Sequence, residues 1–261
     1  MLGAVIGDIV GSRFEWRNHK SKDFELFTPN CRFTDDSVLT FAIASALLLY
    51  DGTNDLEQLA VEQMHTIGNL YPNAGFGGKF MQWLQNPNSQ PYFSFGNGAA
   101  MRISPVGFAA RSPEEVHELT RAVTSGTHNH YEAYRGAEAV SMSIFLAREG
   151  ATQEEIRERI RKDYYPLDQT LDEIRPGYTF NVTCLGSVPQ AIEAFLEASD
   201  FEDAIRNAIS IGGDSDTIAA MAGGIAEAFF GIPDAIREKA LTYLDPRMTE
   251  ILEKFEARFP G

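Results

Sequence analysis

Apolar residues recur along this chain with the period of an α-helix. Residues 37–49 are apolar on almost every side, which predicts a buried helix rather than a surface one. Residues 56–70 place their apolar side chains on one face, and Pro113 follows Ser112 in the pattern of a helix start. Further helices are predicted over residues 131–148, 188–196, 201–211, 217–230 and 248–259, and a loop over residues 172–180.

Patterns typical of β-strands are nearly absent. Runs of alternating β-branched residues are rare, no hairpin signal is visible, and no linker-like stretch divides the 261 residues. The fold class is therefore predicted to be all-α, with a single compact multi-helix domain over residues 1–261. Small residues also recur at helical spacing near both ends of the chain, which indicates closely packed central helices. They include Gly3, Gly7 and Gly11, and Ala219, Ala220, Ala222, Gly223, Gly224 and Ala226.

The charge of the chain narrows the classes of partner. Lys and Arg total 22 against 37 for Asp and Glu, a formal net charge of -15, which disfavours nonspecific binding to nucleic acid or anionic lipid.

No apolar run is long enough to span a bilayer, and no basic leader follows Met1. Cys31 and Cys184 form no metal-binding pattern and are predicted to be reduced thiols. We expect a cytoplasmic protein, and a monomer as the default for a domain of this size.

Two acidic clusters of matching composition stand about 180 residues apart. They are Thr34-Asp35-Asp36 and Asp214-Ser215-Asp216-Thr217. Each opens a helical segment and offers two carboxylates and a threonine hydroxyl, the hard oxygen donors that Mg²⁺ or Mn²⁺ prefers. Either cluster alone is explained by helix capping. If the fold joins them, four carboxylates would repel one another strongly without a cation. Gly212-Gly213, just before the second cluster, would let a bulky ligand approach the backbone.

Three further features offer weaker signals. Gly96-Asn97-Gly98 is a glycine-rich loop whose backbone N–H groups suit a phosphate or diphosphate, although such a sequence is most often a turn. The segment over residues 127–130 contains His128 but lacks the ligand pattern of a zinc site, and a polar helix start with a capping Asn129 is the alternative. Glu15, taken alone, is a surface acid.

In this order, the motifs resemble those of the ADP-ribosylglycohydrolases, which include the dinitrogenase-reductase-activating glycohydrolase and the eukaryotic ADP-ribosylhydrolases. The resemblance covers nearly the whole chain. The motifs that carry it are Gly7-Asp8 with Gly11 and Glu15, Phe33-Thr34-Asp35-Asp36-Ser37, Gly96-Asn97-Gly98-Ala99-Ala100-Met101-Arg102, Thr127-His128, and Gly212-Gly213-Asp214-Ser215-Asp216-Thr217-Ile218-Ala219.

The resemblance implies an all-α domain with two Mg²⁺ or Mn²⁺ ions in a central cleft. It implies metal ligands at Thr34, Asp35, Asp36, Asp214, Asp216 and Thr217. It places a diphosphate against the loop of Ser94, Phe95, Gly96, Asn97 and Gly98, with His128 at the ligand site. Glu15 matches an acid on the mobile loop above the metals, and Glu15 or Asp35 is the candidate for proton transfer. Only 18 residues separate Glu15 from Thr34, a shorter flap than many relatives have.

The predicted activity is metal-dependent hydrolysis of the glycosidic bond between ADP-ribose and an acceptor, with release of ADP-ribose. The substrate would be a modified protein or a small conjugate, and the acceptor stays open among arginine, serine, a nucleobase, O-acetyl-ADP-ribose and a small phosphorylated sugar. The net charge counts mildly against modified nucleic acid. One alternative is a non-catalytic ADP-ribose-binding protein of the same fold. The other is a phosphohydrolase using Asp214-x-Asp216, whose motif would follow a β-strand, although residues 209–211 are too short a strand signal.

Overall fold

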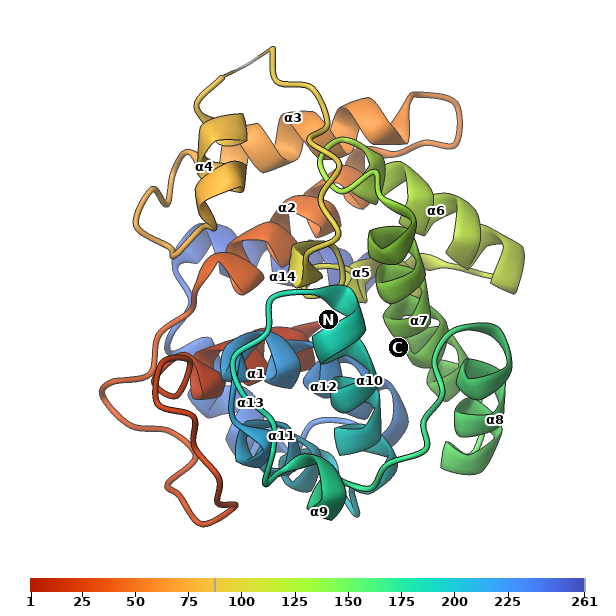
Figure 1. The fold of residues 1–261 in the computed structure, drawn as a ribbon. Helices are drawn as coiled ribbons and strands as arrows, with labels where there is room; N and C mark the ends of the chain where they lie inside the picture. The colour runs from red at the N-terminus through yellow and green to blue at the C-terminus, as the bar shows by residue number, and fades with distance from the viewer. Residues whose placement is uncertain (87, 261) are drawn as a thin grey trace.

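A computed structural model describes residues 1–86 and 88–260 of the chain. These residues fold into α-helices with one short 3-10 helix, η1, as Figure 1 shows. The elements in chain order are α1 (Leu2–Gly11), α2 (Asp35–Leu49), α3 (Leu56–Gly68), α4 (Gly78–Leu84), η1 (Asn97–Ala99), α5 (Ser104–Ala109), α6 (Pro113–Ser125), α7 (Tyr131–Arg148), α8 (Gln153–Asp163), α9 (Leu171–Ile174), α10 (Cys184–Leu196), α11 (Phe201–Ile211), α12 (Ser215–Phe230), α13 (Asp234–Leu241) and α14 (Pro246–Arg258). The described residues contain no strand, only an isolated bridge between Gly96 and Thr183. The predicted all-α fold is confirmed.

The first and the twelfth helices pack against each other at the centre of the molecule (Figure 1). A Cβ atom at Gly7 would lie 2.0 Å from the carbonyl oxygen of Ala219, and one at Gly3 would lie 2.2 Å from that of Gly223. The two backbones are therefore in direct contact, which only glycine permits. The amino group of Met1 also pairs with Glu227 at 2.7 Å. The predicted close packing of central helices is confirmed, and it sets α1 beside the start of α12.

The second helix is buried as predicted, since it packs against α1, α3, α5 and α14. It begins at Asp35 rather than at residue 37, because the Thr34 side chain caps it by accepting from the Asp36 N–H. The acids of the first cluster are thus the first turn of α2. No described helix is long and apolar enough to cross a membrane.

Several boundaries differ from the prediction, mostly where a polar side chain caps a helix. The helix expected from residue 188 begins at Cys184, where the Thr183 hydroxyl accepts from the N–H of Gly186. The loop predicted over residues 172–180 starts inside a helical turn, α9, which is closed by the capping box of Thr170 and Glu173. The predicted reduced cysteines are both buried and unbonded to each other.

The strand that a phosphohydrolase motif would need is not formed. Ile209 and Ile211 lie in the last turn of α11, and Asp214 precedes the next helix. The Asp-x-Asp phosphohydrolase alternative is therefore wrong on structural grounds.

Candidate functional site

The two acidic clusters meet in the folded chain. The Thr217 hydroxyl donates to Asp36 Oδ2 at 3.4 Å, although these residues lie 181 positions apart. Both clusters open helices, α2 and α12, whose N-terminal ends converge because α1 packs against each of them. The condition on which the metal site depended is therefore met: the fold joins the clusters.

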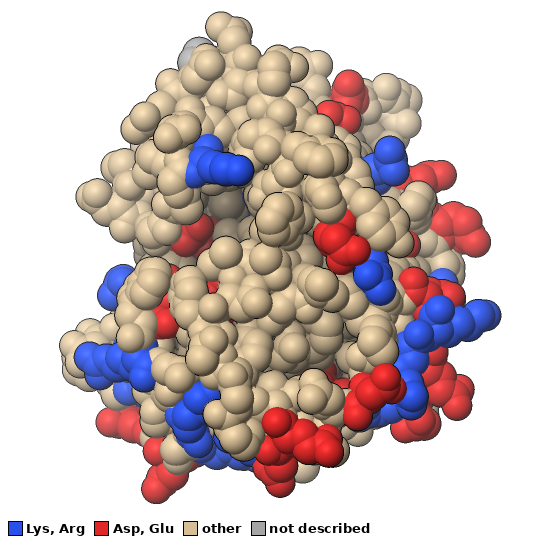
Figure 2. Space-filling view, viewed as in Figure 1, with Lys and Arg blue, Asp and Glu red and all other residues tan. Residues whose placement is uncertain are grey.

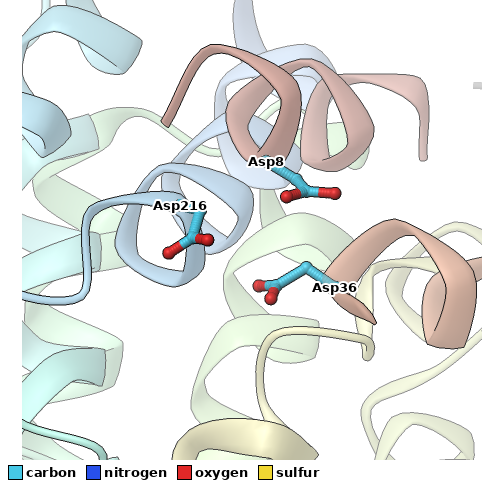
Figure 3. Close-up of side chains that lie close together, drawn as sticks. All are labelled: Asp8, Asp36 and Asp216. Atoms are coloured by element: carbon cyan, nitrogen blue, oxygen red, sulfur yellow. The ribbon is translucent and has the colours of Figure 1, made fainter. Parts of the chain in front are cut away.

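Carboxylate oxygens gather in two overlapping groups. Asp8, Asp36 and Asp216 each offer one oxygen within 4.8 Å of the others, and their side chains converge from α1, α2 and α12 in Figure 3. Glu15, Asp214 and Asp216 form a second group of the same size. Asp216 belongs to both. This arrangement could hold cations at two neighbouring positions.

Burial makes these carboxylates costly to ionise without a counter-charge. Burial, reinforced by the charge of Asp8, raises the pKa of Asp35 to about 8. Burial, and to a smaller extent the negative charge of Asp214, raise the pKa of Glu15 to about 7. The pKa values of Asp36 and Asp216 also lie well above the usual range, again because of burial first and neighbouring acids second.

The donor chemistry fits a hard dication. Asp36 Oδ1 is buried and has no hydrogen-bond partner among the described residues, which is a cost that a bound cation would remove. The Thr34 hydroxyl donates its proton to Asp8 Oδ1 at 2.6 Å and accepts from the Asp36 N–H, so one oxygen lone pair is left for a cation. Oxygen donors of this kind are those that Mg²⁺ and Mn²⁺ take.

Asp8 is a residue that the sequence prediction missed as part of the site. Its carboxylate accepts from the Thr34 N–H at 2.8 Å, from the Ser37 N–H at 3.1 Å and from both hydroxyls of these residues. Asp8 therefore anchors the first turn of α2 from α1 and orients the first cluster. The available signal was an aspartate inside the otherwise apolar helix LGAVIGDIVG.

A cleft of about 520 Å³ lies over the carboxylates and is visible as the hollow in the face shown in Figure 2. Of the predicted metal and catalytic residues, all but Thr34 line it, since Thr34 is buried behind them. Of the predicted substrate loop, all but Phe95 line it. The Phe95 ring is instead exposed and packs against His130, with ring centroids 5.5 Å apart.

The glycine-rich loop is less open than its sequence predicts. The N–H of Gly96 donates to the Ser94 hydroxyl and that of Asn97 donates to the Val182 carbonyl, at 3.1 and 2.8 Å. Two of the backbone donors expected to face a phosphate are therefore in use. The N–H of Gly98 has no hydrogen bond within the described part of the chain and lies beside the cleft.

The two glycines before the second cluster are required by the packing of the chain itself, and not by a ligand. Gly212 and Gly213 have φ angles of +77° and +73°, which glycine adopts without strain. A Cβ atom at Gly213 would lie 2.5 Å from the Tyr178 ring, and one at Gly212 would lie 2.4 Å from Asn18. The expectation that these glycines admit a bulky ligand is therefore wrong, because neighbouring side chains fill the space.

The histidine segment is only partly a helix start. The cap of α7 is His130, whose Nδ1 accepts from the Glu132 N–H at 3.0 Å, so the expected Asn129 cap is wrong. His128 is buried and lines the cleft. Burial, with the nearby charge of Arg102, lowers the pKa of His128 well below its usual value, which keeps the ring neutral.

An aromatic pair at the cleft was also missed. The rings of Trp16 and Phe180 stack with centroids 4.8 Å apart, and both side chains line the cleft and are exposed. Because they come from segments 164 residues apart, neither sequence position signals the other. Their stack joins the segment that carries Glu15 to the segment before α10.

Comparisons with known proteins agree on one family. A model described as ADP-ribosylglycohydrolase matches residues 1–260. Human ADP-ribosylhydrolase ARH3 is 26% identical over 311 residues, which cover 89% of this chain and 84% of ARH3. The ADP-ribosylarginine hydrolase Tri1 of Pseudomonas putida (strain GB-1) is 26% identical over 268 residues, which cover 89% of this chain and 70% of Tri1. A solved structure described as an ADP-ribosylglycohydrolase-related protein complex superposes with a TM-score of 0.73 at 25% identity, covering 98% of this chain and 95% of that one.

Proposed function

This chain belongs to the ADP-ribosylglycohydrolase family, and on that premise we propose that it is a hydrolase that cleaves the glycosidic bond between ADP-ribose and an acceptor. The substrate would be a modified protein or a small ADP-ribose conjugate. The observation that carries this proposal is that two sets of three carboxylates, which share Asp216, lie together at one cleft beside the glycine-rich loop.

We further propose that the site works with two Mg²⁺ ions, or Mn²⁺ in their place. The residues that would hold them are Thr34, Asp35, Asp36, Asp214, Asp216 and Thr217. When bound, such ions supply Lewis-acid chemistry and lower the pKa of water in the site. Support comes from the raised pKa values of these buried acids and from the unpartnered Asp36 Oδ1.

The chain's own residues supply the remaining chemistry. Cleavage at the C1″ carbon passes through an oxocarbenium-like transition state, whose positive charge the carboxylates in the cleft floor stabilise. Glu15 is the proposed group for moving the proton, since its half-buried carboxyl lines the cleft and lies in one cluster with Asp214 and Asp216. Asp35 is the second candidate, because it lines the same cleft.

The Ser94 to Gly98 loop and His128 are the proposed binding site for the diphosphate. The net charge of -15 does not oppose this, because it is spread over a surface that salt screens, whereas the loop and a pair of dications act at close range.

A panel of conjugates tests the function directly. ADP-ribose linked to arginine, to serine, to a nucleobase or to acetate is incubated with Mg²⁺, Mn²⁺ or EDTA, and released ADP-ribose is measured. We expect release from at least one conjugate with metal and none with EDTA. No release from any conjugate would refute the hydrolase, and binding of ADP-ribose without release would favour the non-catalytic alternative.

A further inference from the structure

A buried arginine stands at the wall of the cleft without an acidic partner. Arg102 is 1% exposed and lines the cleft, yet it makes no ion pair among the described residues. Its Nη1 is buried with no hydrogen-bond partner. In a chain of net charge -15, an unpaired buried guanidinium is a cost to folding that calls for a functional reason.

Among the described residues, the Arg102 side chain makes one hydrogen bond, and this bond leads to His128 through Thr127. Arg102 Nη2 donates to the Thr127 hydroxyl at 2.7 Å, and an arginine can only donate. The Thr127 oxygen is therefore an acceptor in this bond, and its own proton is available to another group. His128 Nδ1 lies 2.8 Å from this oxygen, and no other acceptor of the hydroxyl proton is present among the described residues.

Only a bond from the Thr127 hydroxyl to Nδ1 gives the hydroxyl proton an acceptor among the described residues, and that direction corresponds to one tautomer of the histidine. When Nδ1 of a neutral imidazole accepts a hydrogen bond, the proton of the ring is on Nε2. The ring is neutral because burial and the charge of Arg102 both lower the pKa of His128.

The other ring nitrogen, Nε2, lies beside the glycines of the loop, and His128 lines the cleft. A Cβ atom would lie 3.1 Å from Nε2 at Gly98 and 3.7 Å at Gly96, so a side chain at either position would crowd this nitrogen. No described residue accepts a hydrogen bond from Nε2. A donor without a protein acceptor, beside a loop that is open at Gly98, is placed to meet an oxygen of a ligand.

We propose that Arg102 is a positioning residue that acts through Thr127 to hold His128 in the Nε2–H tautomer, so that His128 donates a hydrogen bond to an anionic oxygen of the ligand. The identity of that oxygen, on a diphosphate, rests on the proposed function. Arg102 itself adds positive potential behind the same wall. The tautomer does not depend on any ligand.

The tautomer is measured by long-range ¹H–¹⁵N NMR of the free protein, with His128→Asn to assign the signal among the five histidines. We expect wild type and Thr127→Ser, which keeps the hydroxyl, to show the Nε2–H form. Thr127→Val, which removes the hydroxyl, and Arg102→Met, which removes the donor at similar side-chain length, should populate the Nδ1–H form. An Nδ1–H tautomer in wild type, or no change in Thr127→Val, overturns the proposal.

Affinity for ADP-ribose, measured by calorimetry, gives the second readout. We expect about tenfold weaker binding in Thr127→Val and less than about twofold change in Thr127→Ser. Thr124→Val is the matched control, because Thr124 lies only three residues before Thr127, in the last turn of α6, and its buried hydroxyl has no partner among the described residues. Equal weakening in Thr124→Val would mean a structural effect and would overturn the proposal. If wild type does not bind ADP-ribose at all, the proposed function fails, while the NMR result still decides the tautomer.

Discussion

The side-chain amide of Asn97 donates a hydrogen bond to Asp214 Oδ2 at 2.7 Å, across 117 residues of chain. This bond links the glycine-rich loop to the second acidic cluster. It favours the charged form of Asp214, whose pKa burial otherwise raises. The two halves of the proposed site, one for metal and one for diphosphate, are therefore connected through one buried pair.

Replacing Asn97 should weaken metal binding more than it weakens the fold. Asn97→Ala removes the donor that orients Asp214, and loss of a partner of this kind typically lowers metal affinity by about 10-fold or more. We expect the Mg²⁺ concentration for half-maximal ADP-ribose release to rise by about that factor. Asn69→Ala, at an exposed asparagine that bonds only within α3, is the control and should leave the titration unchanged.

The metal-free protein should lose stability as the pH rises. The folded-state pKa values of about 7 for Glu15 and about 8 for Asp35 exceed the unfolded values near 4. Between about pH 4 and about pH 8 the folded state binds more protons than the unfolded state does. The free energy of unfolding therefore falls as the pH rises through this range. In EDTA we expect the Tm to drop by roughly 5 °C between pH 5 and pH 8.

Saturating Mg²⁺ should remove that fall, because the cations balance the ionised carboxylates and bind only the folded state. The Tm gap between Mg²⁺ and EDTA should therefore widen with pH. A gap that is constant from pH 5 to pH 8 would show that these acids do not bind the metal.

Glu15→Gln should reduce turnover strongly, and it should raise the metal requirement less than Asp214→Ala does. Amide in place of carboxyl removes proton transfer, which contributes about 10²- to 10⁴-fold to rate, and we expect kcat to fall within that range. Asp214→Ala should abolish turnover and raise the metal requirement. Glu25→Gln, at an exposed acid in the same flap, is the control. Near-normal turnover in Glu15→Gln beside an inactive Asp214→Ala would refute the role of Glu15 and keep the metal site.

Gly11→Ala should destabilise the protein and disturb the site together. A Cβ atom at Gly11 would lie 2.4 Å from Asp216 Cα, so α1 and the start of α12 would have to separate. We expect a loss of at least about 2 kcal/mol in the free energy of unfolding, measured with denaturant, because overpacking costs about 1–3 kcal/mol. Gly177→Ala, where a Cβ atom meets nothing within 4 Å, should change it by less than about 0.5 kcal/mol.

From the sequence alone, most of the longer helices and the residues that carry oxygen donors could be predicted, whereas α4, α5, α8, α9 and α13 were missed. The apolar run of α2 and the glycine stripe of α1 predict buried, closely packed helices, because the period of side chains along a helix is local information. The acids at the starts of α2 and α12 are likewise recognisable from the sequence alone. The order of the motifs matched one family.

The roles of these oxygen donors follow only from the tertiary structure. It alone shows that the Asp8 carboxylate accepts hydrogen bonds from Thr34 and Ser37. It also shows that Gly212 and Gly213 make room for Asn18 and Tyr178, and that Trp16 stacks on Phe180. These relations join residues far apart in the chain, and the sequence carries no periodic signal for such pairs. Whether a buried polar atom is paired or orphaned depends on all its neighbours at once, as at Asp36, Arg102 and His128, so only the folded chain reveals it.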